Sequence, residues 1–143
     1  LLVVLGTDFV QRGTLAVLPL VAGLPFALLV AAILYLNQFP DRQADEAAGK
    51  RTLVVYWGAK KARWGYVVLT AMAYLWLALA VGVGALPLWC GLAWLPVAFS
   101  LKASLALLKH ATEPALLTPA IQATIAAANL NGLLLALGLV LSA

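Results

Sequence analysis

The densest polar segment of the chain places amide and carboxylate oxygens at a regular spacing. Asn37, Asp41 and Asp45 follow one another every four residues beside long apolar runs. If the segment is helical, these side chains share one face, with neighbouring Cβ atoms about 6 Å apart. Two carboxylates at that spacing repel each other, but a hard divalent cation between them reverses the effect. The spacing predicts a metal site. Magnesium fits best, because it takes one or two protein carboxylates and leaves positions for water and phosphate oxygens.

Basic residues follow the acidic series directly. Gly49 is placed to end a helix in the left-handed conformation, and Lys50 and Arg51 come next. An ammonium group and a guanidinium fork are the two usual ways in which proteins hold phosphate. The segment therefore offers phosphate ligands beside metal ligands.

Pro40 lies inside the same segment and changes its expected geometry. It removes one helical hydrogen bond and clashes with the carbonyl of Leu36, which predicts a kink there that frees this carbonyl and tips the acidic turn toward neighbouring helices. A second interpretation stays open, in which the segment is a charged, solvated helix end. Arg42 would then pair with Asp45 or Glu46, because surface ion pairs are common and contribute little free energy.

The composition indicates that these residues belong to a membrane protein. Of the 143 residues, 65% are apolar and 10% are charged, and the mean hydropathy is +1.04. A soluble domain of this length leaves too much of its surface in water to bury so many apolar side chains. The bilayer is therefore the predicted solvent.

Net charge and cysteine content exclude other classes. The 9 basic residues outnumber the 5 acidic ones, but they lie in short gaps between apolar runs, and we expect no nucleic-acid partner. The single cysteine, Cys90, excludes an internal disulfide and any metal site built from several cysteines.

Four apolar runs are long enough to cross the hydrocarbon core, which takes about 20 residues. They cover residues 15–37, 62–83, 86–108 and 118–141, and residues 1–9 are typical of the tail of a fifth run. Strands are discounted, because the runs are long, rich in Leu and Ala, and show no period of two. We predict an all-α, multi-span transmembrane bundle with about four full spans and a partial one.

The distribution of basic residues predicts the orientation of the chain. Six of them lie between the first and second full spans and two near the connection between the third and fourth, which places eight of the nine on one side. Because Lys and Arg concentrate in cytoplasmic loops, we expect a multi-pass protein of the cytoplasmic membrane with its site loops in the cytoplasm. Trp57, Trp64, Trp89 and Trp94 lie near predicted span ends, as interfacial anchors do.

The polar segment resembles a known motif. Residues Asn37-Gln38-Phe39-Pro40-Asp41, through Asp45, to Gly49-Lys50-Arg51-Thr52-Leu53 are similar to the second aspartate-rich motif of the UbiA superfamily of intramembrane prenyltransferases. The Gly-Lys-Arg-Thr-Leu ending is most similar to the dihydroxynaphthoate prenyltransferase branch of menaquinone synthesis. The motif match is specific over residues 37–53, and the hydropathy pattern continues it to the C-terminus.

This resemblance implies a cavity that opens sideways to the bilayer, in which two acidic motifs hold Mg²⁺ ions and a prenyl diphosphate. Asp41 and Asp45 would be the catalytic metal ligands, with Asn37 beside them at metal and substrate, and Lys50 and Arg51 would lie at the diphosphate. The implied reaction transfers a polyprenyl group to an aromatic quinone precursor such as dihydroxynaphthoate. Metal and cations stabilise the departing diphosphate, an aromatic carbon attacks the ionised allylic carbon, and an apolar cavity shelters the cation.

One part of the family pattern has no counterpart here. The first acidic motif, of the Asn-Asp-x-x-Asp kind, is absent, and the remaining acids are Asp8, Glu46 and Glu113. We expect Asp8 on the opposite side of the membrane, and Glu113 stands alone. We therefore expect residues 1–143 to be the C-terminal portion of a single transmembrane prenyltransferase domain, half of a UbiA-type bundle. The missing N-terminal half would carry the first motif, and the fragment alone would be inactive.

Two asparagines interrupt the last apolar run. Polar side chains in membrane helices usually face the bundle, so Asn129 is a candidate contact for the aromatic acceptor. For both Asn129 and Asn131 the residues alone favour an interhelical hydrogen bond, worth about 0.6 kcal/mol.

Two other functions stay open. In a transporter or channel fragment, Asp41 and Asp45 would form a cation site at the cytoplasmic edge of a pore. In a noncatalytic membrane scaffold, the acidic turn would be a solvated loop. Transport favours paired charges deep within several helices, whereas the charges here concentrate at one edge, and this distribution favours the enzyme.

Overall fold

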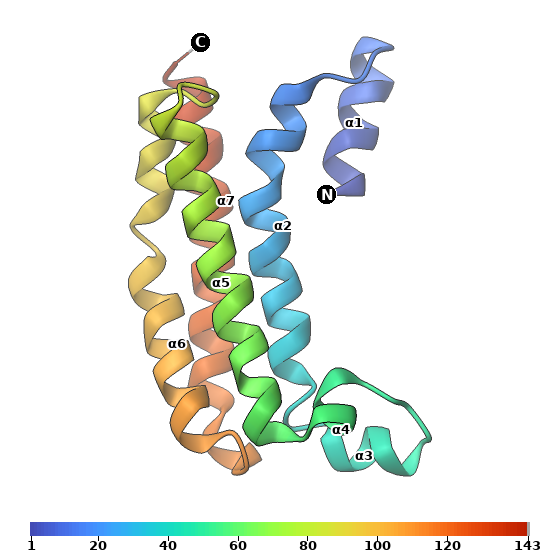
Figure 1. Ribbon diagram of the computed structural model, residues 1–143. Coiled ribbons are helices and arrows are strands. Elements are labelled where there is room, and N and C mark those ends of the chain that lie inside the picture. The colour runs from blue at the N-terminus through green and yellow to red at the C-terminus, as the bar shows by residue number, and fades with distance from the viewer. Residues whose placement is uncertain (143) are drawn as a thin grey trace.

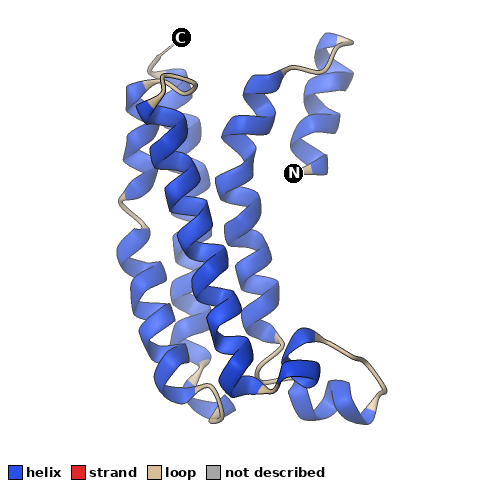
Figure 2. Ribbon diagram, viewed as in Figure 1, coloured by secondary structure: helices blue, strands red, loops and turns tan. Residues whose placement is uncertain are grey.

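The computed structural model describes residues 1–142, which contain helices and no β-strand (Figures 1 and 2). In chain order the elements are α1 (Leu2–Arg12), α2 (Val17–Asn37), α3 (Arg42–Ala47), α4 (Leu53–Trp57), α5 (Ala59–Gly82), the 3₁₀ helix η1 (Leu88–Trp94), α6 (Val97–His110), the 3₁₀ helix η2 (Pro114–Leu116) and α7 (Thr118–Val140). The predicted all-α architecture is confirmed.

Four segments are long and apolar enough to cross a membrane. They are Val17–Asn37, Ala59–Gly82, Leu88–His110 and Thr118–Val140. The four predicted spans are confirmed, with their ends shifted by a few residues. The partial run at the N-terminus forms the short helix α1, which packs against α2.

The four spans lie side by side as a bundle (Figure 1). Helix α2 packs against α5 and α7, and α7 also packs against η1 and α6. Small residues allow these close contacts. At Gly138 of α7, a Cβ atom would lie 2.6 Å from the carbonyl oxygen of Trp89 and 2.7 Å from the Cα of Cys90. The backbones of α7 and η1 therefore touch, which fixes the third and fourth spans against each other.

The third span is not one continuous helix. It changes from η1 to α6 around Pro96, whose missing N–H leaves the carbonyl of Ala93 without the partner that a 3₁₀ pattern would supply. The Nδ2 of Asn131 donates to this oxygen instead, at 2.8 Å. The buried Asn131 thus makes the interhelical hydrogen bond that its residue type favours.

The two ends of the bundle differ in their connections (Figure 1). Helices α3 and α4 lie at one end, with the C-terminal ends of α2 and α6 and the start of α5. The α1–α2 connection, the turn after α5 and the C-terminal end of α7 lie at the other. The first end carries the basic residues between α2 and α5, and the α1–α2 connection carries Arg12. The predicted asymmetry of charge is present along the bundle axis.

Candidate functional site

The acidic segment lies where α2 gives way to α3. Helix α2 ends at Asn37, a turn follows, and α3 begins at Arg42, so the chain breaks the helix fully where a kink was expected. Pro40 has no N–H to continue the pattern. The N–H of Phe39 donates to the carbonyl oxygen of Leu36 at 3.1 Å. The expectation that Pro40 frees this carbonyl is therefore wrong, because a tighter turn occupies it.

The four-residue spacing survives the break. The N–H of Asp41 lies 3.4 Å from the carbonyl oxygen of Asn37, and the N–H of Asp45 donates to the carbonyl oxygen of Asp41 at 2.8 Å. Each residue therefore follows the previous one by a single helical turn, and neighbouring members can face the same way. The backbone spacing on which the metal site depends is present.

The two aspartates have different surroundings. The side chain of Asp45 is 14% exposed, and its Oδ1 lies 3.4 Å from Nζ of Lys50. Asp41 is exposed, and within residues 1–142 no basic side chain comes within ion-pair distance of it. One carboxylate thus has a single cationic neighbour, and the other is open to a ligand.

The alternative pairing of Arg42 with Asp45 or Glu46 is absent from the described residues, where Lys50 is the partner of Asp45. The Nε of Arg42 is buried without a hydrogen-bond partner, and so is Oε1 of Gln38, one turn earlier. Sequence reasoning missed these two groups. Gln38 and Arg42 are four residues apart and directly follow Asn37 and Asp41, and this spacing was the signal in the sequence that could have identified them.

The basic residues follow the end of α3 as expected. Gly49 has a φ of +73°, which is the left-handed conformation, and the N–H of Lys50 donates to the carbonyl oxygen of Asp45 at 2.9 Å. This turn brings the ammonium group of Lys50 back to the acidic series. Arg51 is exposed in the connection to α4. The structure therefore brings Lys50 to Asp45 and leaves Arg51 exposed to solvent.

The oxygen-bearing side chains of this segment fit magnesium better than a metal ion whose ligands all come from the protein. In residues 1–142 no group of three or more His, Cys, Asp and Glu side chains is arranged to hold a metal ion. Asp41 and Asp45 supply two carboxylates on adjacent turns, and Asn37 supplies an amide one turn earlier. Magnesium commonly takes one or two carboxylates and completes its shell with water and substrate phosphates. The residues present fit a metal that is shared with a phosphorylated substrate.

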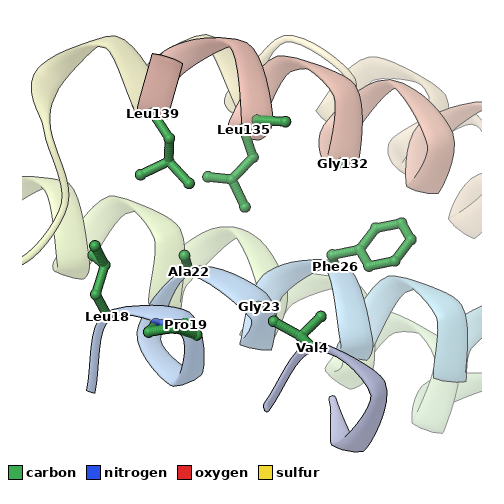
Figure 3. Close-up of a pocket in the computed structure, with 10 residues that line it drawn as sticks. Val4, Leu18, Pro19, Ala22, Gly23, Phe26, Gly132, Leu135 and Leu139 are labelled. Atoms are coloured by element: carbon green, nitrogen blue, oxygen red, sulfur yellow. The ribbon is translucent and has the colours of Figure 1, made fainter. Parts of the chain in front are cut away.

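An apolar pocket of about 450 Å³ lies between α1, α2 and α7 (Figure 3). Its walls include Val4 of α1, Phe26 of α2 and Leu139 of α7, and no charged side chain lines it. Because Gly132 has no side chain, α7 can lie close to Phe26 at this wall of the pocket. A Cβ atom at position 132 would lie 3.0 Å from the ring of Phe26. Phe26 and Asn37 lie on the same helix, about 16 Å apart along its axis. The pocket and the acidic segment are therefore joined by one rigid element.

The two asparagines of α7 differ in burial. Asn131 is buried, whereas Asn129 is exposed and does not make the interhelical contact that its residue type favours. Asn129 precedes Gly132 by three residues, so the two share one face of the helix. The structure thus places Asn129 on the face of α7 that lines the apolar pocket, one turn closer to the acidic end.

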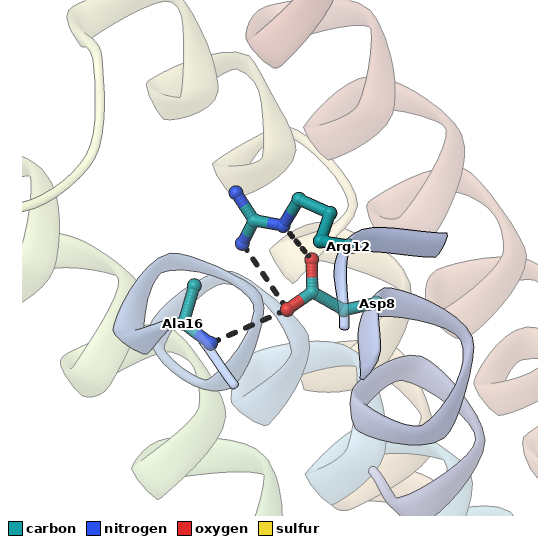
Figure 4. Close-up of polar contacts among 3 residues, drawn as sticks. All are labelled: Asp8, Arg12 and Ala16. Atoms are coloured by element: carbon teal, nitrogen blue, oxygen red, sulfur yellow. Dashed lines mark hydrogen bonds and ion pairs between the residues drawn. The ribbon is translucent and has the colours of Figure 1, made fainter. Parts of the chain in front are cut away.

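The third aspartate of the chain serves the α1–α2 connection at the opposite end (Figure 4). Asp8 accepts from Nε of Arg12 at 2.7 Å and from Nη2 of Arg12 at 3.1 Å. It also accepts from the N–H of Ala16, directly before α2, at 3.3 Å. Asp8 is therefore engaged in holding two helices together, far from Asp41 and Asp45.

The UbiA prenyltransferase family matches residues 1–130 of the chain. The chain is 28% identical over 139 residues to the 1,4-dihydroxy-2-naphthoate octaprenyltransferase of Bacillus subtilis (strain 168), a match that covers 97% of the chain and 44% of that protein. It is also similar to UbiA prenyltransferase domain-containing protein 1 of Ailuropoda melanoleuca (36% identical) and of Homo sapiens (34% identical). Each of these matches spans 93 residues, which is 65% of the chain and 28% of the relative.

The chain thus spans less than half the length of these relatives. No solved structure matches it at a significant level. The family match includes the acidic segment, the basic residues after it and the pocket residues of α1 and α2, and it ends before Gly132, the first α7 residue that lines the pocket. Because this match extends over most of the sequence and agrees with the membrane bundle, the chain belongs to the UbiA prenyltransferase family.

Proposed function

We propose that the chain is part of an enzyme that transfers a polyprenyl group from a prenyl diphosphate to an aromatic acceptor, with Mg²⁺ bound at Asp41 and Asp45. The observation that carries this proposal is the series Asn37, Asp41 and Asp45 on successive turns, with Lys50 beside it. The name of the Bacillus subtilis relative supports a quinone precursor, such as 1,4-dihydroxy-2-naphthoate, as the acceptor.

Each polar residue of the site has a role in this proposal. Asp41 and Asp45 would hold the metal, and Asn37 would add an amide oxygen to the metal or the substrate. Lys50 and Arg51 would bind the diphosphate oxygens. Magnesium, when bound, supplies positive charge that stabilises the departing diphosphate. Because Lys50 approaches Asp45 only to 3.4 Å, its ammonium group can turn to a phosphate without losing a strong hydrogen bond.

The apolar pocket supports a place for the prenyl chain. It begins about 16 Å from Asn37 along α2, and its lining carries no charge that a hydrocarbon chain would have to desolvate. Its apolar walls would also keep water from a carbocation at the allylic carbon. Asn129 lies between the pocket and the acidic end, and we place it at the aromatic acceptor.

The placement in the membrane and the missing part of the site belong to the same proposal. The acidic end would face the cytoplasm from the cytoplasmic membrane, because basic residues gather at that end. A second acidic motif would come from an N-terminal half of the same domain. Residues 1–143 expressed alone would then show no transfer, and turnover by these residues without that half would contradict this part of the proposal.

Charge placement supports an enzyme over a transporter. The ion pairs within residues 1–142 are Asp8–Arg12, Lys50–Asp45 and His110–Glu113, and each lies at a helix end or in a connection. A transport pathway would favour paired charges near the middle of several spans. The scaffold alternative expects a solvated acidic turn, and Asp41 and Arg51 are exposed, but the prenyltransferase family match favours the enzyme.

Replacing Asp41 or Asp45 with alanine tests the proposal, in the protein joined to its N-terminal half. Transfer from radiolabelled prenyl diphosphate in the presence of Mg²⁺ should fall about 100-fold or more, as expected when a main source of charge stabilisation is lost. Glu46→Ala is the matched control, since Glu46 is an exposed acid on the same short helix and should leave the rate unchanged. Normal rates in either aspartate variant would overturn the assignment.

A further inference from the structure

Helix α4 and the first turns of α5 carry a surface that the proposed reaction does not use. Tyr56 and Trp57 end α4, and Trp64 lies in α5, and these side chains are 74%, 50% and 54% exposed. Lys60 and Lys61 lie between them and are exposed. Three exposed aromatic residues and two exposed lysines thus fall within nine consecutive residues, in α4 and the start of α5. These two elements lie at the acidic end of the bundle (Figure 1).

This surface continues as one exposed stripe along α5. After Lys60, Lys61 and Trp64, exposed positions recur at Val68, Ala71, Met72, Leu75, Ala78 and Leu79. Intervals of three and four residues keep these positions on one helix face. Other faces of α5 pack against α2, η1 and α6. A stripe that changes from lysine through tryptophan to aliphatic residues is typical of a helix that passes from water into lipid.

The two lysines have no counter-charge within the described part of the chain. No carboxylate of residues 1–142 lies within ion-pair distance of Lys60 or Lys61. The first turn of α5 contains no acidic residue, and its start carries the positive end of the helix dipole. Positive charge is therefore concentrated there, and an anion from outside the protein complements it. At the edge of the bilayer, the anions present at high density are lipid phosphates.

We propose that Tyr56, Trp57, Lys60, Lys61 and Trp64 form a binding surface for the phosphate headgroups of anionic membrane lipids. The two ammonium groups contact the phosphates, and the aromatic rings lie against the glycerol region just below. The surface uses other residues than the proposed diphosphate site, where Lys50 pairs with Asp45. It depends on the membrane placement of α5 and not on the proposed transfer reaction.

Lipid binding to the purified protein in detergent tests this surface. The protein is titrated with phosphatidylglycerol and, separately, with phosphatidylcholine, and retained lipids are counted by native mass spectrometry. The wild-type protein should prefer phosphatidylglycerol. The variant K60Q/K61Q should lose about 30-fold of this preference, roughly fivefold for each lysine. The matched control K102Q/K109Q removes the same charge from exposed positions of α6 and should keep the preference.

Each outcome decides for or against the surface. A wild-type protein without preference, an unchanged K60Q/K61Q variant, or an equal loss in both double variants would overturn the proposal. Helix content and thermal unfolding of the variants show whether the fold is kept. If K60Q/K61Q does not fold, the single variants K60Q and K61Q should each lose about fivefold. K60R/K61R keeps the charge and should keep the preference.

Discussion

Two helix junctions at opposite ends of the bundle carry aspartate next to basic residues, and they differ in how fully the carboxylates are bound. At the α1–α2 junction, Asp8 accepts two contacts from Arg12 and one from the N–H of Ala16 (Figure 4). At the α2–α3 junction, Asp45 has one neighbour, Lys50 at 3.4 Å. Asp41 has no ion pair within the described part of the chain. The carboxylate of Asp8 is fully used in holding a turn, whereas Asp41 has no ion-pair partner among the described residues and Asp45 has one distant neighbour, which leaves both more available to a ligand.

The local backbone explains this difference. Arg12 follows Asp8 by one helical turn, and Gly13, with a φ of +70°, reverses the chain so that α2 begins beside the same carboxylate. At the other junction, the basic residue next to Asp41 in sequence is Arg42, whose Nε is buried without a hydrogen-bond partner and which forms no ion pair within the described residues. An aspartate beside an arginine in sequence is therefore not evidence of an ion pair.

The largest expected effect is the loss of prenyl transfer when the carboxylate of Asp45 is removed, compared with removal of the carboxylate of Asp8 at the other junction. Asp45→Asn should lower prenyl transfer about 100-fold or more while the protein stays folded. Asp8→Asn should leave the transfer rate within about twofold and lower the midpoint of thermal unfolding, because the α1–α2 connection loses its ion pair. Activity and thermal unfolding are measured on both variants. If Asp8→Asn stays folded but loses transfer, the α1–α2 junction is needed for the reaction as well as for stability, and the proposed difference between the junctions is wrong.

A smaller effect should follow from the single cationic neighbour of Asp45. Lys50→Gln should raise the KM for prenyl diphosphate about tenfold, which is the value of one charge-assisted hydrogen bond. The KM for the aromatic acceptor should not change. Steady-state kinetics with each substrate varied in turn measure both constants, and Lys102→Gln in α6 controls for general loss of charge. A change confined to the acceptor would show that Lys50 holds a different substrate.

The apolar pocket near the α1–α2 end tests whether that end also takes part in binding. Gly132→Leu should fill the pocket, because even a Cβ atom at this position lies 3.0 Å from the ring of Phe26. Donors with long prenyl chains should lose about fivefold in kcat/KM relative to short ones, a difference of about 1 kcal/mol. Gly82→Leu, at a glycine with no atom within 4 Å of its added Cβ, is the control. Equal losses for all chain lengths would contradict this use of the pocket.

The smallest effect concerns the two asparagines of α7. Asn131→Leu should lower the free energy of unfolding by about 0.6 to 1.7 kcal/mol, because the carbonyl of Ala93 loses its donor. Asn129→Leu should leave this free energy unchanged, because Asn129 is exposed. Chemical denaturation in detergent measures both variants. If both variants lose the same free energy of unfolding, Asn129 also stabilises the fold, and the burial of the two asparagines does not distinguish their roles.

Some parts of the site were predictable from the sequence because they depend on local rules. The spacing of Asn37, Asp41 and Asp45 is kept by backbone hydrogen bonds across the break. Gly49 takes the left-handed conformation that its position predicts. The break at Pro40 was expected only as a kink, because the tight turn before it depends on how the chain leaves the end of α2.

Other parts were not predictable, because α7 is apolar around most of its circumference. A helix of this kind shows no amphipathic pattern from which its buried face can be read. Asn129 and Asn131 therefore looked equivalent in sequence, although one is exposed and the other is buried. The buried atoms of Gln38 and Arg42 were missed for a related reason, since their burial depends on packing around α3.

The sequence by itself determined that the chain crosses a membrane as helices and carries carboxylates one turn apart at one edge. These features follow from run length, apolar composition and residue spacing, which act over a few turns of chain. Only the tertiary structure decided which polar groups are satisfied. The donor for Ala93 is 38 residues away, on another helix, and Asp45 meets Lys50 only because the chain turns at Gly49. Such contacts depend on how distant segments pack, and no local pattern specifies that packing.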